Sequence, residues 1–117
     1  MQTWVFDLDG TITAFPDEMN ALMSSLKAAG HRVEVLSGFK GDSADQSVLD
    51  EKQALLKSLG CDCYDRLVVV ANPKNDVAAQ KAAYMRQVNA TALVDNNHKN
   101  VRTVRKAGFL VMRPGRK

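Results

Sequence analysis

The amino-acid sequence predicts an α/β fold, a three-layer α/β/α sandwich around a five-stranded, mainly parallel sheet. Short apolar runs rich in β-branched residues alternate along the chain with segments whose apolar residues recur at helical spacing. One of these runs, "LVVVA" at 67–71, is unbroken, which is typical of a strand covered on both faces. Such alternation favours parallel strands joined by right-handed helical crossovers, with helices on both sides of the sheet.

Each expected strand is an apolar run that ends at a polar residue, a glycine or a proline. The five runs are 3–8, 32–36, 66–71, 90–94 and 109–112. A polar loop, 37–45, follows the second of them. This order predicts four crossovers, one between each strand and the next.

The first two helices are recognised by their periodicity and their ends. Pro16 suits the first turn of a helix, and apolar residues then recur at i, i+3, i+4 and i+7 from Met19 until Gly30. The second helix carries an inward face from Val48, through Lys52, to Leu59. Glycines close both helices.

The last two helices are expected to start at polar caps. Asp76 precedes a segment with helical periodicity that runs to about Val88. Asn97 begins a shorter helix that ends near Ala107, with Gly108 in the position that favours a left-handed backbone.

Composition indicates one compact domain over residues 1–117. The chain has 45% apolar and 25% charged residues, which is ordinary for a globular protein. No apolar run is long enough to cross a bilayer, and the N-terminus lacks the pattern of a signal peptide. We therefore expect a cytoplasmic protein without a membrane partner, in which Cys61 and Cys63 stay reduced.

The charge is mildly basic. The formal net charge is +3 and the pI is about 9.0, which slightly favours anionic partners. The C-terminal segment 105–117 is rich in arginine and lysine. It is interpreted either as a solvated tail or as a contact for nucleic acid.

Polar residues gather at the ends of the expected strands. Asp7 and Asp9 end the first, Ser37 and Gly38 the second, and Asp95 the fourth. The carboxyl ends of parallel strands share one edge, where ligands bind in open α/β sheets. Asp7 and Asp9 are expected on the same side of an extended strand, because side chains alternate. A lysine from the third crossover, Lys74 or Lys81, joins them.

These residue types predict a phosphate site with a hard cation. A divalent ion held by Asp7, Asp95 and a backbone carbonyl lets the acids approach each other, and oxygen ligands without a His or Cys cluster favour Mg²⁺. Ser37 and the amides after it suit a phosphate oxygen, and the lysine adds a point charge.

Taken one at a time, these features have simpler interpretations. Ser37 and Gly38 suit a turn, the segment 95–97 suits a helix cap, and Asp7 and Asp9 suit a turn after a strand. The hypothesis of a shared site depends on their arrival at one edge.

The motifs resemble those of the haloacid dehalogenase-like (HAD) phosphatases, with a Rossmann-like core. "FDLDGT" resembles the first motif, "VLSG" the second, Lys81 or Lys74 the third, and "LVDNN" the fourth. They occur in the family's order and cover nearly the whole chain. The segment "VRKAGFLVMRPG" and the late helix with its lysine are more loosely similar to the phosphatase domain of polynucleotide kinase/phosphatases.

The resemblance implies a role for each matched residue. Asp7 would be the nucleophile that forms an aspartyl-phosphate, and Asp9 the general acid and base. Lys81 would neutralise the phosphate and Asp7, and Ser37 and Gly38 would bind the phosphate. Thr11 would order the turn and fix Asp9, contributing to the substrate site. Asp7, Asp95 and the carbonyl of Asp9 would hold Mg²⁺.

The sequence departs from the family's pattern at two positions. Asn96 stands where many relatives have a second acid, which leaves less charge for Mg²⁺. Phe39 stands where nucleic-acid-end phosphatases of the family often have arginine. Lys81 is favoured over Lys74 because it fits a helix that begins near Asp76.

Two functions follow from this pattern. The first is a Mg²⁺-dependent phosphatase, a hydrolase of phosphate monoesters such as a nucleotide or a nucleic-acid end. The alternative is a non-catalytic protein of the same fold that binds phosphate or nucleic acid. The gaps after Thr11 and after Asn72 are too short for a cap domain. The site is therefore expected to be open unless the loop 38–47 or a partner subunit of a homo-oligomer covers it.

Overall fold

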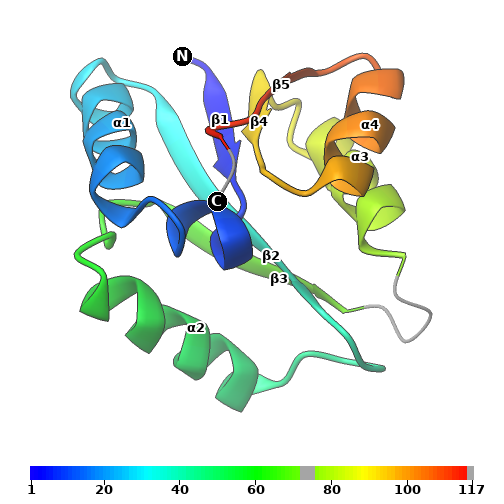
Figure 1. Ribbon diagram of the computed structural model, residues 1–117, viewed down its shortest axis with the longest axis horizontal. Helices are drawn as coiled ribbons and strands as arrows, with labels where there is room; N and C mark the ends of the chain where they lie inside the picture. Colours follow the sequence, from blue (N-terminus) through cyan, green and yellow to red (C-terminus); the bar gives the residue numbers. More distant parts are fainter. Residues whose placement is uncertain (72–75, 116–117) are drawn as a thin grey trace.

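The computed structural model describes residues 1–71 and 76–115, and its centre is a parallel sheet (Figure 1). The strand order is β3-β2-β1-β4-β5, and every pairing between neighbours is parallel. The strands are β1 (Thr3–Phe6), β2 (Arg32–Phe39), β3 (Arg66–Ala71), β4 (Ala92–Val94) and β5 (Leu110–Met112).

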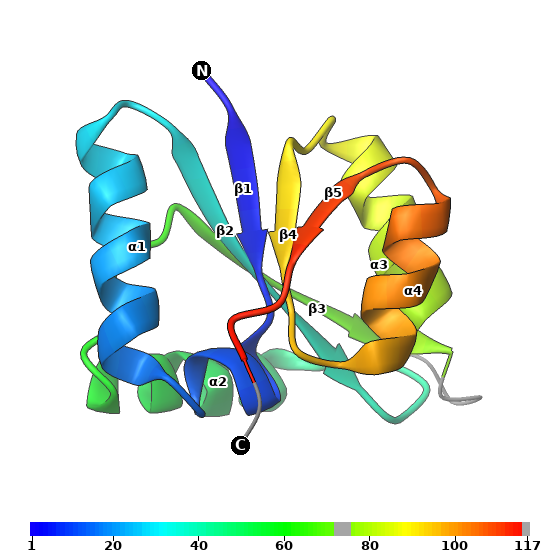
Figure 2. The same cartoon turned by 45° about the horizontal axis from the view of Figure 1, so that its top comes forward.

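Two helices cover each face of the sheet (Figures 1 and 2). The helices are α1 (Pro16–Ala28), α2 (Gln46–Ser58), α3 (Val77–Gln87) and α4 (His98–Lys106). α1 and α2 lie on one face, and α3 and α4 lie on the other. The predicted α/β class, a Rossmann-like three-layer sandwich with five parallel strands, is confirmed.

The sheet separates two apolar cores, because successive side chains of a strand point to opposite faces. On β1, Phe6 packs with Met19 and Met23 of α1, whereas Val5 packs with Met85 of α3 and its neighbours. Val5, Phe6 and Met23 are fully buried. Both faces of the central strand β1 are therefore covered by apolar side chains.

Strand β3 differs from the expectation. Its unbroken apolar run predicts burial on both faces, but β3 lies at the edge of the sheet and its residues from Leu67 to Ala71 are only half-buried. An apolar run reports the composition of a strand, and its position in the sheet depends on pairing partners far along the chain.

The chain turns sharply directly after β1. The strand ends at Phe6, two residues earlier than expected, and the turn Leu8–Ile12 follows. Gly10 has φ of +81°, a left-handed conformation that costs glycine little. The backbone N–H of Gly10 donates to Oγ1 of Thr13 at 2.9 Å, which stabilises the turn.

Strand β2 is longer than expected and continues to Phe39. Its alternation directs Val33, Val35 and Ser37 toward α1 and α2, and Gly38 toward α3. A Cβ atom on Gly38 would lie 2.8 Å from a methyl group of Val77, so the start of α3 approaches β2 closely there.

In the part of the chain that the structure describes, no helix is both long and apolar enough to traverse a bilayer.

A buried carboxylate connects the sheet to α3. Glu34 is 2% exposed, its Oε1 accepts a hydrogen bond from the hydroxyl of Tyr84, and its Oε2 accepts one from Nε of Arg32 at 2.7 Å. Burial, followed by the contact with Glu34, raises the pKa of Tyr84 to about 12. The neutral phenol is therefore the form that the folded state favours.

This contact predicts a loss of stability in alkali that depends on Tyr84. At neutral pH, Tyr84→Phe should lower the free energy of unfolding by about 2 kcal/mol, the usual contribution of a hydrogen bond to a charged group. Because the folded pKa is raised above that of the unfolded chain, this difference is fully present below pH 10. It should shrink as the pH rises through about 12. Urea denaturation of both proteins across this range measures the difference. A gap that stays constant to high pH would contradict the assignment.

Candidate ligand site

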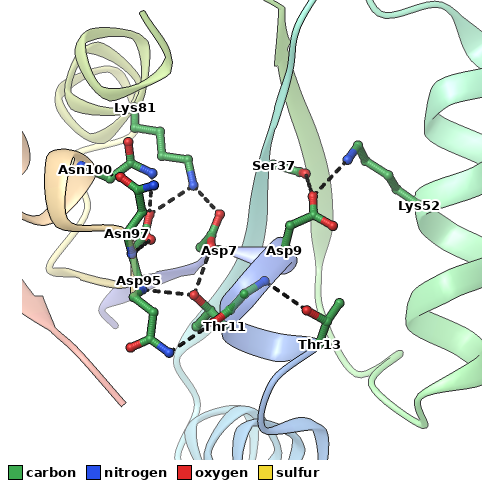
Figure 3. Close-up of polar contacts among 12 residues, drawn as sticks. Asp7, Asp9, Thr11, Thr13, Ser37, Lys52, Lys81, Asp95, Asn97 and Asn100 are labelled. Atoms are coloured by element: carbon green, nitrogen blue, oxygen red, sulfur yellow. Dashed lines mark hydrogen bonds and ion pairs between the residues drawn. The ribbon is translucent and has the colours of Figure 1, made fainter. Parts of the chain in front are cut away.

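Asp7 lies at the point where β1 gives way to the turn. Its backbone N–H donates to the carbonyl of Val94 at 2.9 Å, so it continues the pairing of β1 with β4. Its Oδ1 accepts from Nζ of Lys81 at 2.5 Å, and its Oδ2 accepts from the hydroxyl of Thr11 at 2.9 Å (Figure 3). The carboxylate is therefore held on both sides.

Asp95 approaches the same lysine from the end of β4. Its Oδ2 accepts from Nζ of Lys81 at 3.1 Å and from Nδ2 of Asn100 at 3.0 Å. Its Oδ1 accepts from the backbone N–H of Asn97 at 2.8 Å. The start of α4 thus fixes this carboxylate, since Asn97 is also the cap whose Oδ1 accepts from the N–H of Asn100.

Lys81 supplies the positive charge that the two acids require. Lys81 and Asp95 are fully buried and Asp7 is 6% exposed. Burial raises the pKa of the Asp7 carboxyl to about 6, with Asp95 adding to the rise and Lys81 opposing it. Burial alone would lower the pKa of Lys81, but Asp7 and Asp95 together hold it above its usual value. Sequence reasoning expected a divalent ion between the acids, whereas here an ammonium group joins them.

Asp9 points away from this pair. The expectation that Asp7 and Asp9 share one side is wrong, because the strand ends at Phe6 and alternation no longer applies in the turn. The side chain of Asp9 is 66% exposed, and its Oδ2 lies 3.3 Å from Nζ of Lys52 and 3.4 Å from the hydroxyl of Ser37. Figure 3 shows Asp7 and Asp9 directed to opposite sides of the strand end.

The arrangement of acids bears on the predicted metal site. Among residues 1–71 and 76–115, no three His, Cys, Asp or Glu side chains are grouped to hold a metal ion. Asp7 and Asp95 share a partner, but Asp9 does not join them through its side chain. Any Mg²⁺ would therefore have two carboxylates from this chain and would take its other ligands elsewhere.

Thr11 and Asn96 position other groups. Thr11 is fully buried; its hydroxyl donates to Asp7 and accepts from the N–H of Asn96 at 3.0 Å. Thr11 was expected to fix Asp9, but in the structure it fixes Asp7 instead. Nδ2 of Asn96 donates to the carbonyl of Gly10 at 3.0 Å. Asn96 thus connects the end of β4 to the turn after β1. Thr11 and Asn96 support the site through these contacts and do not line the pocket described below.

An open pocket of about 410 Å³ lies beside these groups, within the usual range for ligand sites. Its walls come from the ends of β1 and β2 and the first turns of α3 and α4. The described residues that line it are Asp7, Asp9, Gly38, Phe39, Lys40, Val77, Ala78, Lys81, Asn97, Lys99 and Asn100. Ser37 is absent from this lining because the alternation of β2 turns it toward α2.

The structure brings together most of the predicted residues that it describes. Lys81 lies in the site, while Lys74 and Asn72 lie outside the described residues. Gly38 lines the pocket as expected, and Ser37 is fully buried next to Asp9.

Sequence reasoning missed the remaining polar residues of the site. Lys52 occupies an inward position of a helix that is otherwise apolar there, which is a signal that could have identified it. Asn100 is 8% exposed, but only the structure shows that this amide is buried, so the sequence offers no comparable signal for it. Lys40 and Lys99 carry no such signal, because they are exposed and only the fold brings them to the pocket.

Comparison with known proteins places the fold among solved structures. No protein-family model matches the sequence, and no curated protein matches it. A universal stress protein from Archaeoglobus fulgidus, solved in complex with dAMP, is similar with a TM-score of 0.68 and 14% identity, covering 97% of each chain. A universal stress protein in complex with cAMP has a TM-score of 0.62 and 17% identity, over 99% of this chain and 98% of the other. A member of that family from Burkholderia pseudomallei has a TM-score of 0.55 and 24% identity, over 96% and 94%.

These similarities correct the family drawn from the motifs. The neighbours are universal stress proteins and not HAD-like phosphatases, so the assignments as a HAD member, a hydrolase and a Mg²⁺-dependent phosphatase are wrong. The physical reason is that this topology brings the ends of β1, β2 and β4 to one edge in any protein that has it. Convergence of Asp7, Lys81 and Asp95 therefore follows from the fold and does not identify a reaction. The catalytic roles predicted for Asp7, Asp9 and Lys81 depend on phosphate-ester hydrolysis. The observed positions of these side chains do not depend on that reaction.

The buried ion pairs predict strong coupling between Lys81 and its acids. Lys81→Met leaves two buried carboxylates without their cation and should lower the free energy of unfolding by about 3 kcal/mol. Adding Asp7→Asn should recover part of that loss, with a coupling of about 1–3 kcal/mol in a double-mutant cycle. Urea denaturation measures all four proteins. Lys57→Met, at an exposed lysine of α2, should change stability by no more than about 0.5 kcal/mol. Strictly additive effects of Lys81→Met and Asp7→Asn would contradict the buried pairing.

Proposed function

We propose that this chain is a non-catalytic nucleotide-binding protein whose pocket, at the carboxyl edge of the sheet, takes a mononucleotide. The observation that carries the proposal is the composition of the pocket, in which lysines and an aromatic ring line the same cavity of about 410 Å³. A nucleotide has an anionic phosphate and a flat base, so it matches both parts of this lining.

The phosphate would lie near the lysines. Lys40, Lys81 and Lys99 line the pocket, against two acids, Asp7 and Asp9. In the described part of the chain, Lys40 and Lys99 form no ion pair, whereas Lys81 is shared between Asp7 and Asp95. The exposed lysines are thus available to an anion, and Lys81 adds a fixed positive charge deeper in the site.

The base would lie against Phe39. This ring is half-buried at the end of β2 and packs closely on Gly41, where a Cβ atom would come within 2.6 Å of it. Val77 and Ala78 add apolar surface from the start of α3. A positioned ring of this kind supports stacking, which contributes about 1–3 kcal/mol per base.

The structural neighbours support a nucleotide as the ligand. Two of them are described as complexes with dAMP and with cAMP, and both share the fold over nearly the whole chain. Binding at the carboxyl edge is the usual position of ligands in open α/β sheets.

Mg²⁺ is part of the proposal as a companion of the ligand's phosphate. The carboxylate oxygens of Asp7 and Asp95 are hard donors on either side of Lys81, and two carboxylates are as many as Mg²⁺ commonly takes from a protein. Phosphate oxygens and water would complete its coordination. Such an ion would offset the negative charge of the two acids next to the phosphate.

Calorimetric titration with AMP, cAMP and inorganic phosphate tests the proposal. AMP should bind more tightly than phosphate, because the base adds stacking on Phe39. Phe39→Leu should weaken AMP by about 1–3 kcal/mol, roughly 5- to 150-fold, and leave phosphate almost unchanged. Lys40→Gln should weaken both ligands. Lys57→Gln, a matched change on α2, should weaken neither.

Two results would overturn this function. The first is the absence of any nucleotide binding by a protein whose melting curve shows it to be folded. The second is release of inorganic phosphate from AMP that Asp7→Asn abolishes, because a non-catalytic protein leaves the phosphate ester intact.

The role of Mg²⁺ has its own test. Mg²⁺ should tighten AMP binding in the native protein, and Asp95→Asn should remove that gain while metal-free binding persists. Asp9→Asn should keep the gain, since the side chain of Asp9 points away from the two acids. Calorimetry with and without Mg²⁺ measures these differences. Equal AMP affinity in both buffers would show that the ion has no part in binding.

A further inference from the structure

A second cavity lies on α4, outside the pocket described above. Its volume is about 350 Å³, and its lining is strongly basic. The lining residues are His98, Val101, Arg102, Arg105 and Lys106 from α4, and Arg113, which follows β5. We refer to this cavity as the α4 groove.

Among the residues that the structure describes, the positive charges of the α4 groove have no acidic partner. No Asp or Glu lines it, and within residues 1–71 and 76–115 none of its four Arg and Lys side chains forms an ion pair. Three arginines and a lysine around one cavity repel one another. An anion bound between them would remove that repulsion.

Two of the arginines are held in place. Nη2 of Arg105 donates to the carbonyl of Val111 at 3.0 Å, and Nη2 of Arg113 lies 3.3 Å from Nε2 of His98. Nε of Arg113 is buried and has no hydrogen-bond partner in the described part of the chain. A buried guanidinium N–H without an acceptor is unfavourable, so a ligand oxygen at this position would stabilise it.

The first turn of α4 contributes residues to both the α4 groove and the nucleotide pocket. Asn97, Lys99 and Asn100 line the pocket, while His98 and Arg102 line the groove. Figure 2 shows α4 beginning at the edge of the sheet where β4 ends, with β5 beside it. Along α4, His98, Arg102 and Lys106 follow one another at intervals of four residues, a rise of about 6 Å each. Cations with this regular spacing suit a ligand whose charges repeat, rather than a single ion.

We propose that the α4 groove binds the phosphate backbone of a single-stranded oligonucleotide whose terminal nucleotide occupies the pocket. The proposal rests on the nucleotide-binding function above and extends it from a mononucleotide to a polymer. Guanidinium groups bind phosphate through two hydrogen bonds, and they and His98 offer flat surfaces for bases. The adjacent pocket, with Phe39 and its lysines, favours nucleic acid over an acidic protein segment. The net charge of +3 would assist the encounter.

Fluorescence anisotropy with a labelled hexanucleotide and its mononucleotide tests the proposal. The native protein should bind the hexanucleotide at least about tenfold more tightly, because several phosphates add contacts. The double variant Arg102→Gln with Lys106→Gln should lose most of this gain. The slope of log affinity against log salt should fall by about 1.4, as expected for two lost phosphate contacts to a single strand. Both residues are exposed and lie outside the pocket, so mononucleotide binding should persist.

The control removes the same charge elsewhere. Lys57→Gln with Arg86→Gln changes two exposed cations on α2 and α3 and should leave the hexanucleotide gain and the salt slope intact. Equal losses in the two double variants would overturn the proposal, because the groove would then act only through net charge. An acidic hexapeptide that binds as tightly as the hexanucleotide would also overturn it, in favour of a protein partner.

The results separate this proposal from the function on which it rests. Binding of AMP without any gain for the hexanucleotide overturns the groove and leaves the nucleotide pocket. Binding of the hexanucleotide that needs Arg102 and Lys106, with no binding of AMP, overturns the link to a terminal nucleotide. A gain that depends on Arg102 and Lys106, together with AMP binding that Phe39→Leu weakens, supports both.

Discussion

The shared contact of Lys81 with Asp7 and Asp95 is the interaction on which the rest of the site depends. The three charges come from the end of β1, the end of β4 and the interior of α3, and all are almost completely removed from water. Neither acid could be buried there at neutral pH without a cation, since an isolated buried charge is strongly unfavourable. The pairing also fixes α3 against the central strands, because Lys81 reaches across to both of them.

Thr11 and Asn96 extend this arrangement beneath the site. Thr11 joins the turn after β1 to Asp7, and Asn96 joins the end of β4 to the same turn. The central strands are thus connected by backbone pairing and by side chains at their ends. Fixed groups of this kind can present charge to a ligand without reorganising, which lowers the entropy lost on binding.

The motifs resemble one family and the structural neighbours belong to another, because the fold alone brings the motif residues together. "FDLDGT" and "LVDNN" describe which residues follow β1 and β4, and a parallel sheet brings such residues together whether the protein hydrolyses its ligand or holds it. Asp9 is the residue that would distinguish a protein that hydrolyses its ligand from one that only binds it. It lies in the turn, exposed and near Lys52, and away from the pair formed by Asp7 and Asp95.

The sequence by itself determined the order of strands and helices along the chain, the parallel sheet, and the arrival of Asp7, Asp95 and a lysine of the third crossover at its carboxyl edge. Local periodicity and strand-end residues carry that information. Tertiary structure alone decided that β3 lies at the edge, that Asp9 turns away, and that Lys40 and Lys99 reach the pocket. It also decided that α4 and Arg113 form a basic groove. These features depend on contacts between residues far apart in the chain, and on where a turn ends the alternation of a strand.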